Sequence, residues 1–523
     1  MNGRNLLKKY NALFYTAIIL IGFISIFLIA SNISNISYSQ DEFVIKYSVT
    51  NYLESGEFHK EKLDTCLYQT DIETIGPEKL LYYNINPTTI LFYSPFFIIF
   101  GENVFPYINL IFFILTLLVS LLLLKDLINY KSIRILGFSM VSFFTILMLW
   151  SSSSYNIIPA LFFFITSIFF IISKNHKNNW IAGIFFSILL FIRFSDIIFL
   201  PAMLLFILIR KEKKINFLRF IIPILLSLII IFFMNFLVFG NPLFLPQTHF
   251  NDCFNIAPID GGLGGIDSIL RFFYHGENQV QNLLLNFNTL IQIIIIFLPL
   301  SLLLILGFLN KKYKEYNLFL FIVFLTTFLF YGRRAAYYGF ATISPFSSFT
   351  RYFLYFFILL ILSFSLYIDN FSIRKNKYIK ILAIITMLLL ILLSAISFLQ
   401  FETYGLEDFN SKKIDFANVQ GDLISSLDKK GIILANFATN KYFYSSNHST
   451  INYEKVFNND KLSEEDYLLE IKSEINETNF PVYLILSEWH KNENDLKIIG
   501  FIELNYPNLK KSKIGGIEIY RIK

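Results

Sequence analysis

The residues best suited to chemistry are two acids, Asp41 and Glu42, which follow Ser39 and Gln40 just beyond the first apolar run of the chain. An ionised carboxylate at the edge of a membrane can act as a general base that takes the proton from an attacking hydroxyl group. Charge in such a place is costly unless it is used or solvated. The competing interpretation is that both acids are only solvated residues at the start of a helix.

The spacing of Ser39, Asp41 and Glu42 fits a capping box at a helix N-terminus. In that motif the Ser39 hydroxyl caps the helix and the Glu42 side chain reaches back to the Ser39 backbone N–H, which gives Glu42 a structural role. Asp41 falls in the first turn, where the helix dipole favours the ionised carboxylate. The spacing therefore predicts Asp41 as the base, with Ser39 and Glu42 as its support.

Arginines within or beside apolar runs form a second group of candidates. Arg193 interrupts one run, Arg351 precedes another, and Arg333 and Arg334 follow a third. Guanidinium groups bind phosphate through paired hydrogen bonds, and charge within a membrane region predicts a function. Arg351 is the strongest phosphate-binding candidate. Arg193 could instead pair only with Asp196, and the Arg333-Arg334 pair could be ordinary loop charge.

Other chemistry-bearing residues give weaker signals. His249 follows the turn signal Gly240-Asn-Pro and could bond a sugar or a phosphate, although a lone loop histidine is more often structural. The chain has two cysteines, Cys66 and Cys253, and no Cys or His spacing typical of a metal site. A disulfide between the two cysteines is compatible with the topology below. No metal ligand is predicted.

The elements that must position these residues are transmembrane helices. The chain has 523 residues, of which 55% are hydrophobic and 16% charged, and its mean hydropathy is +0.56. Such a composition with repeated long apolar runs predicts a polytopic α-helical membrane protein. The net charge of +6 gives no argument for nucleic acid as a partner. Eleven spans are predicted, at about 12–31, 104–124, 135–150, 157–173, 180–192, 197–209, 220–239, 289–309, 317–331, 352–368 and 381–399.

The distribution of positive charge orients these spans. Twenty lysines and arginines fall in segments that the predicted spans place on the same side of the membrane as the N-terminus. Five arginines fall in the short connections on the opposite side. The positive-inside rule therefore places the N-terminus in the cytoplasm and the C-terminus outside the plasma membrane. Residues 88–101 are apolar but short, and we expect them to form a helix in the outer interface. Two large outer loops, 32–103 and 240–288, complete this part of the chain.

The tail after residue 400 has a different pattern. Short β-type runs at 431–436, 482–487 and 517–522 alternate with a helical run at 461–475. In that helical run Leu468, Ile471 and Ile475 recur at helical spacing. These patterns predict a membrane domain at 1–400 and a small outer α/β domain at 401–523.

Taken together, four segments resemble the GT-C superfamily of membrane glycosyltransferases, and in particular the branch that holds protein O-mannosyltransferases and aminoarabinose transferases. The resemblance covers about residues 1–400. The segments are, in chain order, Asp41-Glu42 with Leu53-Glu-Ser-Gly56, Tyr82-Tyr-Asn-Ile-Asn-Pro87, Phe239-Gly-Asn-Pro242 and Ser347-Ser-Phe-Thr-Arg351-Tyr352. The third is similar to a turn of the family, and the fourth to a family segment of the form Gly-x-Arg-Tyr. The second leads into Asn86-Pro87-Thr88, where the family often has Lys- or His-Pro-Pro.

The resemblance implies an inverting transfer of a sugar from a polyprenyl- or dolichyl-phosphate carrier to a glycan, lipid or protein acceptor on the outer face of the membrane. It implies Asp41 as general base, and it makes the arginines Arg351, Arg193 and Arg334 candidates for holding the carrier phosphate. No glycine-rich nucleotide loop is present. Some members need a divalent cation, so the resemblance leaves a metal cofactor open. Residues expected to contact a substrate are Tyr83, Asn86, His249 and Tyr352.

Three alternatives remain open at this point. A polymerase or ligase of surface polysaccharide is expected to carry its main basic site in a late outer loop and to tolerate loss of the first loop. A transporter predicts inverted repeats and acids within spans, whereas the predicted spans are nearly free of acids. An inactive scaffold would keep the fold without the transfer.

Overall fold

The structure is a computed structural model that divides into two compact units. The first, here the helical unit, comprises Met1–Asn35, Asn86–Leu243 and Ile269–Asn410, and the second comprises Ile36–Ile85, Phe244–Ser268 and Ser411–Lys523. The described residues are 3–33, 40–61, 72–75, 79–82, 86–173, 178–209, 214–239, 242–243, 279–297, 314–332, 348–373, 381, 385, 388–389, 391–392, 406–428, 431–436, 439, 449–453, 464–487 and 493–523.

The described part of the helical unit consists of α-helices and two 3-10 segments. Most of them begin and end within a few residues of the predicted apolar runs, and the run at 381–399 lies almost wholly outside the described residues. The elements are α1 (Gly3–Ala30), α3 (Pro87–Phe100), η1 (Glu102–Val104), α4 (Phe105–Leu127), α5 (Lys131–Ser142), α6 (Thr145–Ser151), α7 (Ile157–Ile172), α8 (Asn179–Ile192), η2 (Phe194–Phe199), α9 (Leu200–Ile209), α10 (Lys214–Phe239), α12 (Gln279–Phe297), α13 (Lys314–Tyr331), α14 (Ser348–Tyr352) and α15 (Leu354–Ile373).

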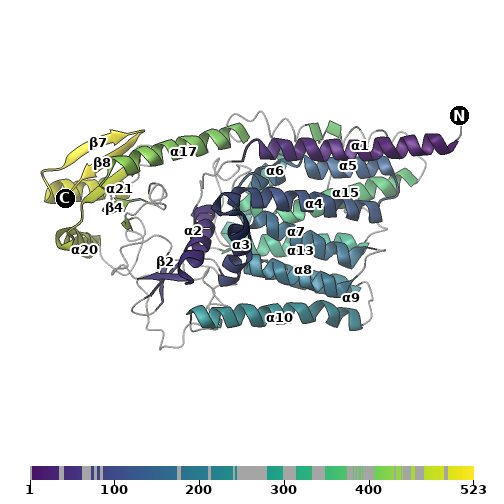
Figure 1. Cartoon of the computed structure of the whole chain (residues 1–523), viewed down its shortest axis with the longest axis horizontal. Coiled ribbons are helices and arrows are strands. Elements are labelled where there is room, and N and C mark those ends of the chain that lie inside the picture. The colour runs from purple at the N-terminus through teal and green to yellow at the C-terminus, as the bar shows by residue number, and fades with distance from the viewer. Residues whose placement is uncertain are drawn as a thin grey trace. The chain divides into compact units, whose positions relative to one another are not determined.

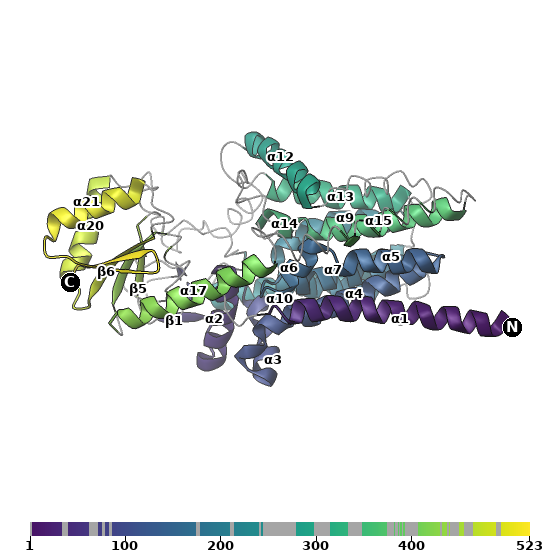
Figure 2. The same cartoon turned by 90° about the horizontal axis from the view of Figure 1, so that it is seen from above.

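The helices of this unit run roughly alongside one another, with α1 and α10 on opposite sides (Figure 1). The turned view separates a layer with α12, α13, α9 and α15 from a layer with α1, α4, α5 and α7 (Figure 2). The α7 helix is apolar around its whole circumference and almost entirely buried, as expected for a central helix. It packs between α4 and α8, and α8 in turn packs on α10.

One close approach between helices depends on a glycine. A Cβ atom at Gly183 of α8 would lie 2.4 Å from the carbonyl oxygen of Phe220 in α10, too close for any side chain. The absence of a Cβ therefore allows the two backbones to meet, as small residues do in membrane helix pairs.

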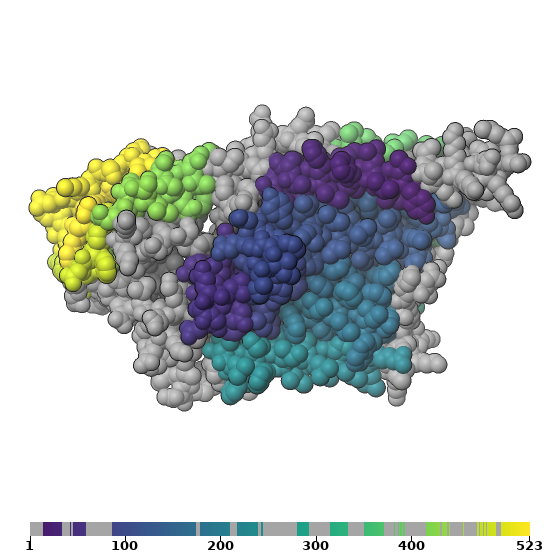
Figure 3. Space-filling view, in the orientation of Figure 1, coloured from purple at the N-terminus to yellow at the C-terminus, as the bar shows by residue number. Residues whose placement is uncertain are grey.

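The outward faces of the helical unit are apolar. On α1, Ile19, Phe23 and Phe27 are exposed, and on α10 the same is true of Ile229 and Phe233; both helices lie at the surface in Figure 3. Exposed apolar faces of this kind suit a lipid environment. The protein is therefore a polytopic α-helical membrane protein, as the sequence predicts.

The lengths of the observed helices differ from those of the predicted spans. Among the described residues, three helices are long and apolar enough to cross a membrane: Glu102–Leu127, Phe217–Val238 and Lys314–Tyr331. The predicted continuous span at 135–150 is instead a bent pair, α5 and α6, with 50° between them, which would make a fourth. The backbone leaves the helix there at Phe143 and Phe144. The α3 helix has 14 residues and ends at Gly101 with φ of 74°, close to the boundaries predicted for an interfacial helix.

The second unit holds α2, a small sheet and the tail domain. The α2 helix is Gln40–Ser55. The small antiparallel sheet has the order β1-β3-β2, formed by His59–Glu61, Lys79–Tyr82 and Ile72–Ile75. The tail elements are α17 (Leu406–Ser426, of which the last sixteen residues lie in this unit), β4 (Ile432–Ala435), β5 (Ser449–Asn452), α20 (Glu464–Glu477), β6 (Val482–Ser487), α21 (Glu493–Asn505), β7 (Lys510–Ile514) and β8 (Ile517–Arg521).

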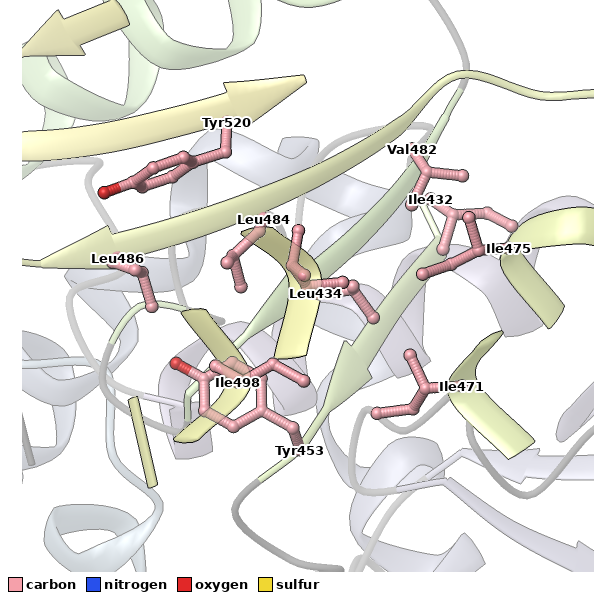
Figure 4. Close-up of a cluster of buried hydrophobic side chains, with 11 residues drawn as sticks. Ile432, Leu434, Tyr453, Ile471, Ile475, Val482, Leu484, Leu486, Ile498 and Tyr520 are labelled. Carbon is pink, nitrogen blue, oxygen red and sulfur yellow. The ribbon is translucent and has the colours of Figure 1, made fainter. Parts of the chain in front are cut away.

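The tail is an α/β domain with a five-stranded sheet of order β5-β4-β6-β8-β7, in which β4 pairs in parallel with both β5 and β6. One face of the sheet packs on α20 and α21, and residues from strands and helices meet there in the cluster drawn in Figure 4. The other face packs on α17. Ile471 and Ile475 of α20 are buried, so the predicted helical run and the three predicted strands are confirmed.

Candidate functional site

The structure brings together two of the predicted phosphate-binding residues, Arg193 and Arg351, although 158 positions separate them along the chain. Arg193 directly follows α8, and Arg351 lies in α14 just before α15. Tyr331, the last residue of α13, and Tyr352 lie between them. These helix ends meet at one end of the helical unit, which is the end that the charge distribution predicts to be the outer one.

Arg193 is held by a buried ion pair. Its Nε lies 3.4 Å from Oδ1 of Asp196, one turn further along the chain. Its Nη2 donates a hydrogen bond of 3.2 Å to the Tyr331 hydroxyl, and the Tyr355 hydroxyl donates to Oδ2 of the same Asp196. Asp196 is fully buried and Arg193 is 8% exposed. Arg193 and Asp196 thus form the ion pair that their spacing allows, and the pair fixes the guanidinium in place.

Arg351 is surrounded by aromatic rings. Its guanidinium carbon lies 5.0 Å from the centroid of Tyr155, 5.1 Å from that of Tyr352 and 6.0 Å from that of Trp150. Its Nη2 also donates a hydrogen bond of 3.2 Å to the Tyr352 hydroxyl. Cations near ring faces are attracted by the ring quadrupole. Arg351 is only half-buried, so its guanidinium is the more accessible of the two.

The two arginines are linked by a pair of stacked tyrosines. The rings of Tyr331 and Tyr352 are nearly parallel, with 3.7 Å between centroids and 6° between planes. Tyr331 accepts from Arg193, and Tyr352 accepts from Arg351. Arg193 also lies 5.8 Å from the Tyr352 ring. One ring stack therefore fixes the spacing of both guanidinium groups.

Hydrogen bonds from two other helices hold the end of α8 that carries Arg193. The Thr89 hydroxyl, in the first turn of α3, donates to the carbonyl oxygens of Phe191 at 3.2 Å and Ile192 at 3.0 Å. Asn156, which precedes α7, donates to the same Ile192 oxygen at 3.2 Å. The last carbonyls of a helix have no partner within the helix, so outside donors satisfy them. Thr88, the last residue of the Asn86-Pro87-Thr88 segment, also donates to the Phe191 carbonyl at 3.0 Å, so this segment helps to hold the end of α8 that precedes Arg193.

Electrostatics favour an anion at this cluster. Among its described residues there are two guanidinium groups, Arg193 and Arg351, and one carboxylate, Asp196. The other polar groups of the residues named above are tyrosine hydroxyls and the Trp150 indole N–H, which can donate hydrogen bonds to an oxyanion. Hydrogen-bonded guanidinium groups that are partly shielded from water attract phosphate more strongly than fully solvated ones do. In the described part of the chain no group of three or more His, Cys, Asp or Glu residues could hold a metal ion.

Asn86 lies at the start of α3, directly before Pro87. It is 2% exposed, and its side chain makes no capping hydrogen bond to the helix. Its Oδ1 has no hydrogen-bond partner among the described residues. The described residues therefore leave this acceptor open, and a contact of Asn86 with a substrate stays a prediction.

The acid pair belongs to the second unit. The α2 helix begins at Gln40, so Asp41 lies in its first turn as predicted. Glu42 is fully buried, so it is not a solvated residue at the start of the helix. Ser39 lies outside the described residues, and the capping box stays a prediction.

Several other predicted residues also lie outside the described part of the chain. They are Tyr83, His249, Arg333, Arg334, Cys66 and Cys253.

Sequence reasoning missed the residues that organise the arginine cluster. Tyr331, Tyr355, Trp150 and Tyr155 all lie at helix ends on one side of the predicted topology. The signal that could have found them is the gathering of aromatic residues at span ends on the side where the outer arginines fall, since aromatic rings are natural partners of arginine.

Solved structures share the fold of this chain. No protein-family profile and no curated protein sequence matches the chain. The apo structure of ArnT from Cupriavidus metallidurans is similar with a TM-score of 0.59 and 9% identity, over 99% of this chain and 98% of that chain. The same protein bound to undecaprenyl phosphate gives 0.58 and 9%, over 98% of each chain. The archaeal oligosaccharyltransferase AglB from Archaeoglobus fulgidus, in complex with an inhibitory peptide and a dolichol-phosphate, gives 0.53 and 13%, over 99% of this chain and 74% of that chain.

Proposed function

We propose that the protein is an inverting glycosyltransferase that moves a sugar from a polyprenyl- or dolichyl-phosphate carrier to an acceptor on the outer face of the membrane. The observation that carries this proposal is the cluster of Arg193 and Arg351 at one end of a GT-C fold. Support also comes from similar structures that hold undecaprenyl phosphate and a dolichol-phosphate.

The arginine cluster would stabilise the leaving group. As the bond between the anomeric carbon and the phosphate oxygen breaks, negative charge grows on the departing polyprenyl phosphate. Preorganised positive groups aimed at that charge lower the barrier because they need no reorganisation. Arg351 is our candidate for direct contact with the phosphate, and Tyr352 would lie beside it. Arg193, whose charge is paired with Asp196, would act from the other side of the tyrosine stack, and Arg334 is a further candidate.

Asp41 would act at the acceptor. It would accept the proton from the acceptor hydroxyl as the hydroxyl oxygen forms its bond to the anomeric carbon. Its place in the first turn of α2 favours the ionised form that a base needs. Ser39 and Glu42 would hold that turn, and Tyr83, Asn86 and His249 would contact the substrates.

The proposed topology has eleven spans, a cytoplasmic N-terminus and an outer tail domain in the plasma membrane, with 1–400 as the membrane domain and 401–523 as the outer domain. Within the helical unit, Arg193, Arg351 and the helix ends around them gather at one end, as an outer catalytic face requires. The acceptor class is a glycan, a lipid or a protein. A divalent cation is compatible with this scheme, and the proposal does not depend on one.

The test is a transfer assay in membranes with a labelled polyprenyl-phosphate sugar. Asp41→Asn should lower transfer by about a hundredfold or more, the usual worth of a general base, while expression and melting temperature stay near wild type. Glu42→Gln is the matched control, because the same change at the buried neighbour should lower the melting temperature more than the rate per folded molecule. Full activity of Asp41→Asn would refute the base assignment. Loss of the first outer loop without loss of activity would favour a polysaccharide polymerase or ligase.

A further inference from the structure

One buried amide in the helical unit bonds three backbone carbonyls at once. Asn109, near the start of α4, is 1% exposed. Its Nδ2 lies 2.6 Å from the oxygen of Ser153, 2.7 Å from that of Tyr155 and 3.3 Å from that of Trp150. The three carbonyls belong to the last residues of α6 and to the turn that follows it before α7, together called the 150–155 turn. A single side chain thus fixes the path of this turn.

The amide is an unexpected residue at this position. The α4 helix is otherwise strongly apolar, and a buried polar group costs free energy unless it is hydrogen-bonded. The carbonyls after the end of a helix need outside donors. The hydrogen bonds from the Asn109 amide therefore satisfy the buried amide itself and also the carbonyls of the 150–155 turn. A leucine there would fit the apolar helix but would leave the turn without them.

The 150–155 turn carries two of the three rings around Arg351. Trp150 and Tyr155 meet edge to face, with 4.8 Å between centroids and 90° between planes. The Arg351 guanidinium lies against both of these rings. The Ser153 hydroxyl donates back to the Trp150 carbonyl at 2.7 Å, which tightens the same turn. The orientation of the two rings, and with it that of the guanidinium, therefore depends on the path of the turn.

We propose that Asn109 is a positioning residue for Arg351. It holds the 150–155 turn so that Trp150 and Tyr155 keep the guanidinium aligned for the phosphate of a polyprenyl phosphate. This inference rests on the proposed function, since it assumes that Arg351 binds that phosphate. Asn109 itself acts only through the turn and the two rings.

The experiment measures the affinity of the full-length protein in lipid nanodiscs for undecaprenyl phosphate. Asn109→Leu should weaken binding about tenfold, as expected when a charge-assisted contact loses its alignment. Asn317→Leu is the matched control, because Asn317 is also a largely buried amide and accepts a hydrogen bond from Ser363. Asn317 lies 14 positions before Tyr331 in α13, about 21 Å along the helix from the arginine cluster. Its replacement should leave the affinity unchanged.

A double-mutant cycle separates positioning from a general loss of structure. In an Arg351→Lys background, Asn109→Leu should have little further effect on affinity, because the guanidinium that it aligns is gone. An unchanged tenfold effect in that background, or equal effects of Asn109→Leu and Asn317→Leu, would overturn the positioning role.

A second variant covers the case in which Asn109→Leu does not fold. Tyr155→Leu removes one of the two rings without touching α4, and it should weaken binding by a similar factor. Wild-type affinity in Tyr155→Leu would refute the inference. If Arg351→Lys and Arg351→Ala both bind like wild type, the phosphate site of the proposed function fails instead.

Discussion

Tyr331 and Tyr352 stack ring on ring, with 3.7 Å between their centroids and 6° between their planes, and each accepts a hydrogen bond from a different arginine. Tyr331 belongs to the end of α13 and Tyr352 to the short α14 helix. The stack thus joins two helix ends and two guanidinium groups. A stacked pair of tyrosines can hold two guanidinium groups at a fixed distance from each other despite their repulsion, and recognition of a phosphate requires such a fixed distance.

The first prediction concerns the ring of Tyr352. Tyr352→Phe keeps the stack and loses the hydrogen bond from Arg351, so affinity for a polyprenyl phosphate should fall only a few fold. Tyr352→Leu removes the ring, the stack and the cation–π contact together, and the loss should reach about tenfold or more. Binding titrations in nanodiscs compare the two. If Phe and Leu at this position give the same affinity, the stacking is not what aligns the arginines.

The second prediction concerns the buried ion pair of Arg193 and Asp196. Arg193→Leu leaves a fully buried carboxylate without its cation, which costs about 3–5 kcal/mol of stability. The double variant Arg193→Leu with Asp196→Asn removes the stranded charge and keeps an acceptor for Tyr355, so most of the stability should return. Thermal unfolding in detergent measures both. Equal melting temperatures for the single and double variants would show that the Asp196 side chain carries no charge in the folded Arg193→Leu variant.

The third prediction concerns pH and the tail domain. Burial raises the pKa of Tyr483, and so does the hydrogen bond of 2.6 Å that its hydroxyl donates to Asp428. A raised pKa means that the folded state favours the protonated tyrosine. The stability that this contributes is complete below the ordinary tyrosine pKa of about 10 and is lost as the pH rises through the higher pKa of the folded state.

Tyr483→Phe tests this prediction in the full-length protein. At pH 8 the variant should lose about 1 kcal/mol, the net worth of one hydrogen bond. Above pH 10 the difference between variant and wild type should shrink and then reverse, because phenylalanine has no proton to lose. Protease susceptibility of the tail as a function of denaturant gives the stability at each pH. A constant difference at every pH would contradict the assignment.

Much of the fold can be predicted from the sequence because its signals are local. Apolar runs predict most helices of the helical unit, and short β-branched runs predict β4, β6 and β8. The three-residue spacing of Arg193 and Asp196 predicts their ion pair, since such residues face each other after one turn. The alternation of spans also predicts that Arg193 and Arg351 fall on the same side.

The rest depends on packing between distant segments. Tyr331 contacts Arg193 across 138 positions, and Asn109 reaches carbonyls more than 40 positions away. No spacing rule encodes such contacts. The bend between α5 and α6 occurs at Phe143 and Phe144, where neither proline nor glycine marks a break. In the tail, α17 is amphipathic and polar, so its role in covering one face of the sheet follows only from the three-dimensional structure.

The most direct test of the account is the affinity of purified protein for undecaprenyl phosphate with and without Arg351. Arg134 supplies the matched control, because its Nε donates to the Ile128 carbonyl at the end of α4 opposite to Asn109. Arg351→Ala should weaken binding by about tenfold to a hundredfold, the worth of a charge-assisted hydrogen bond, and Arg134→Ala should leave it near wild type. Equal affinities for wild type and Arg351→Ala would contradict the proposed phosphate site.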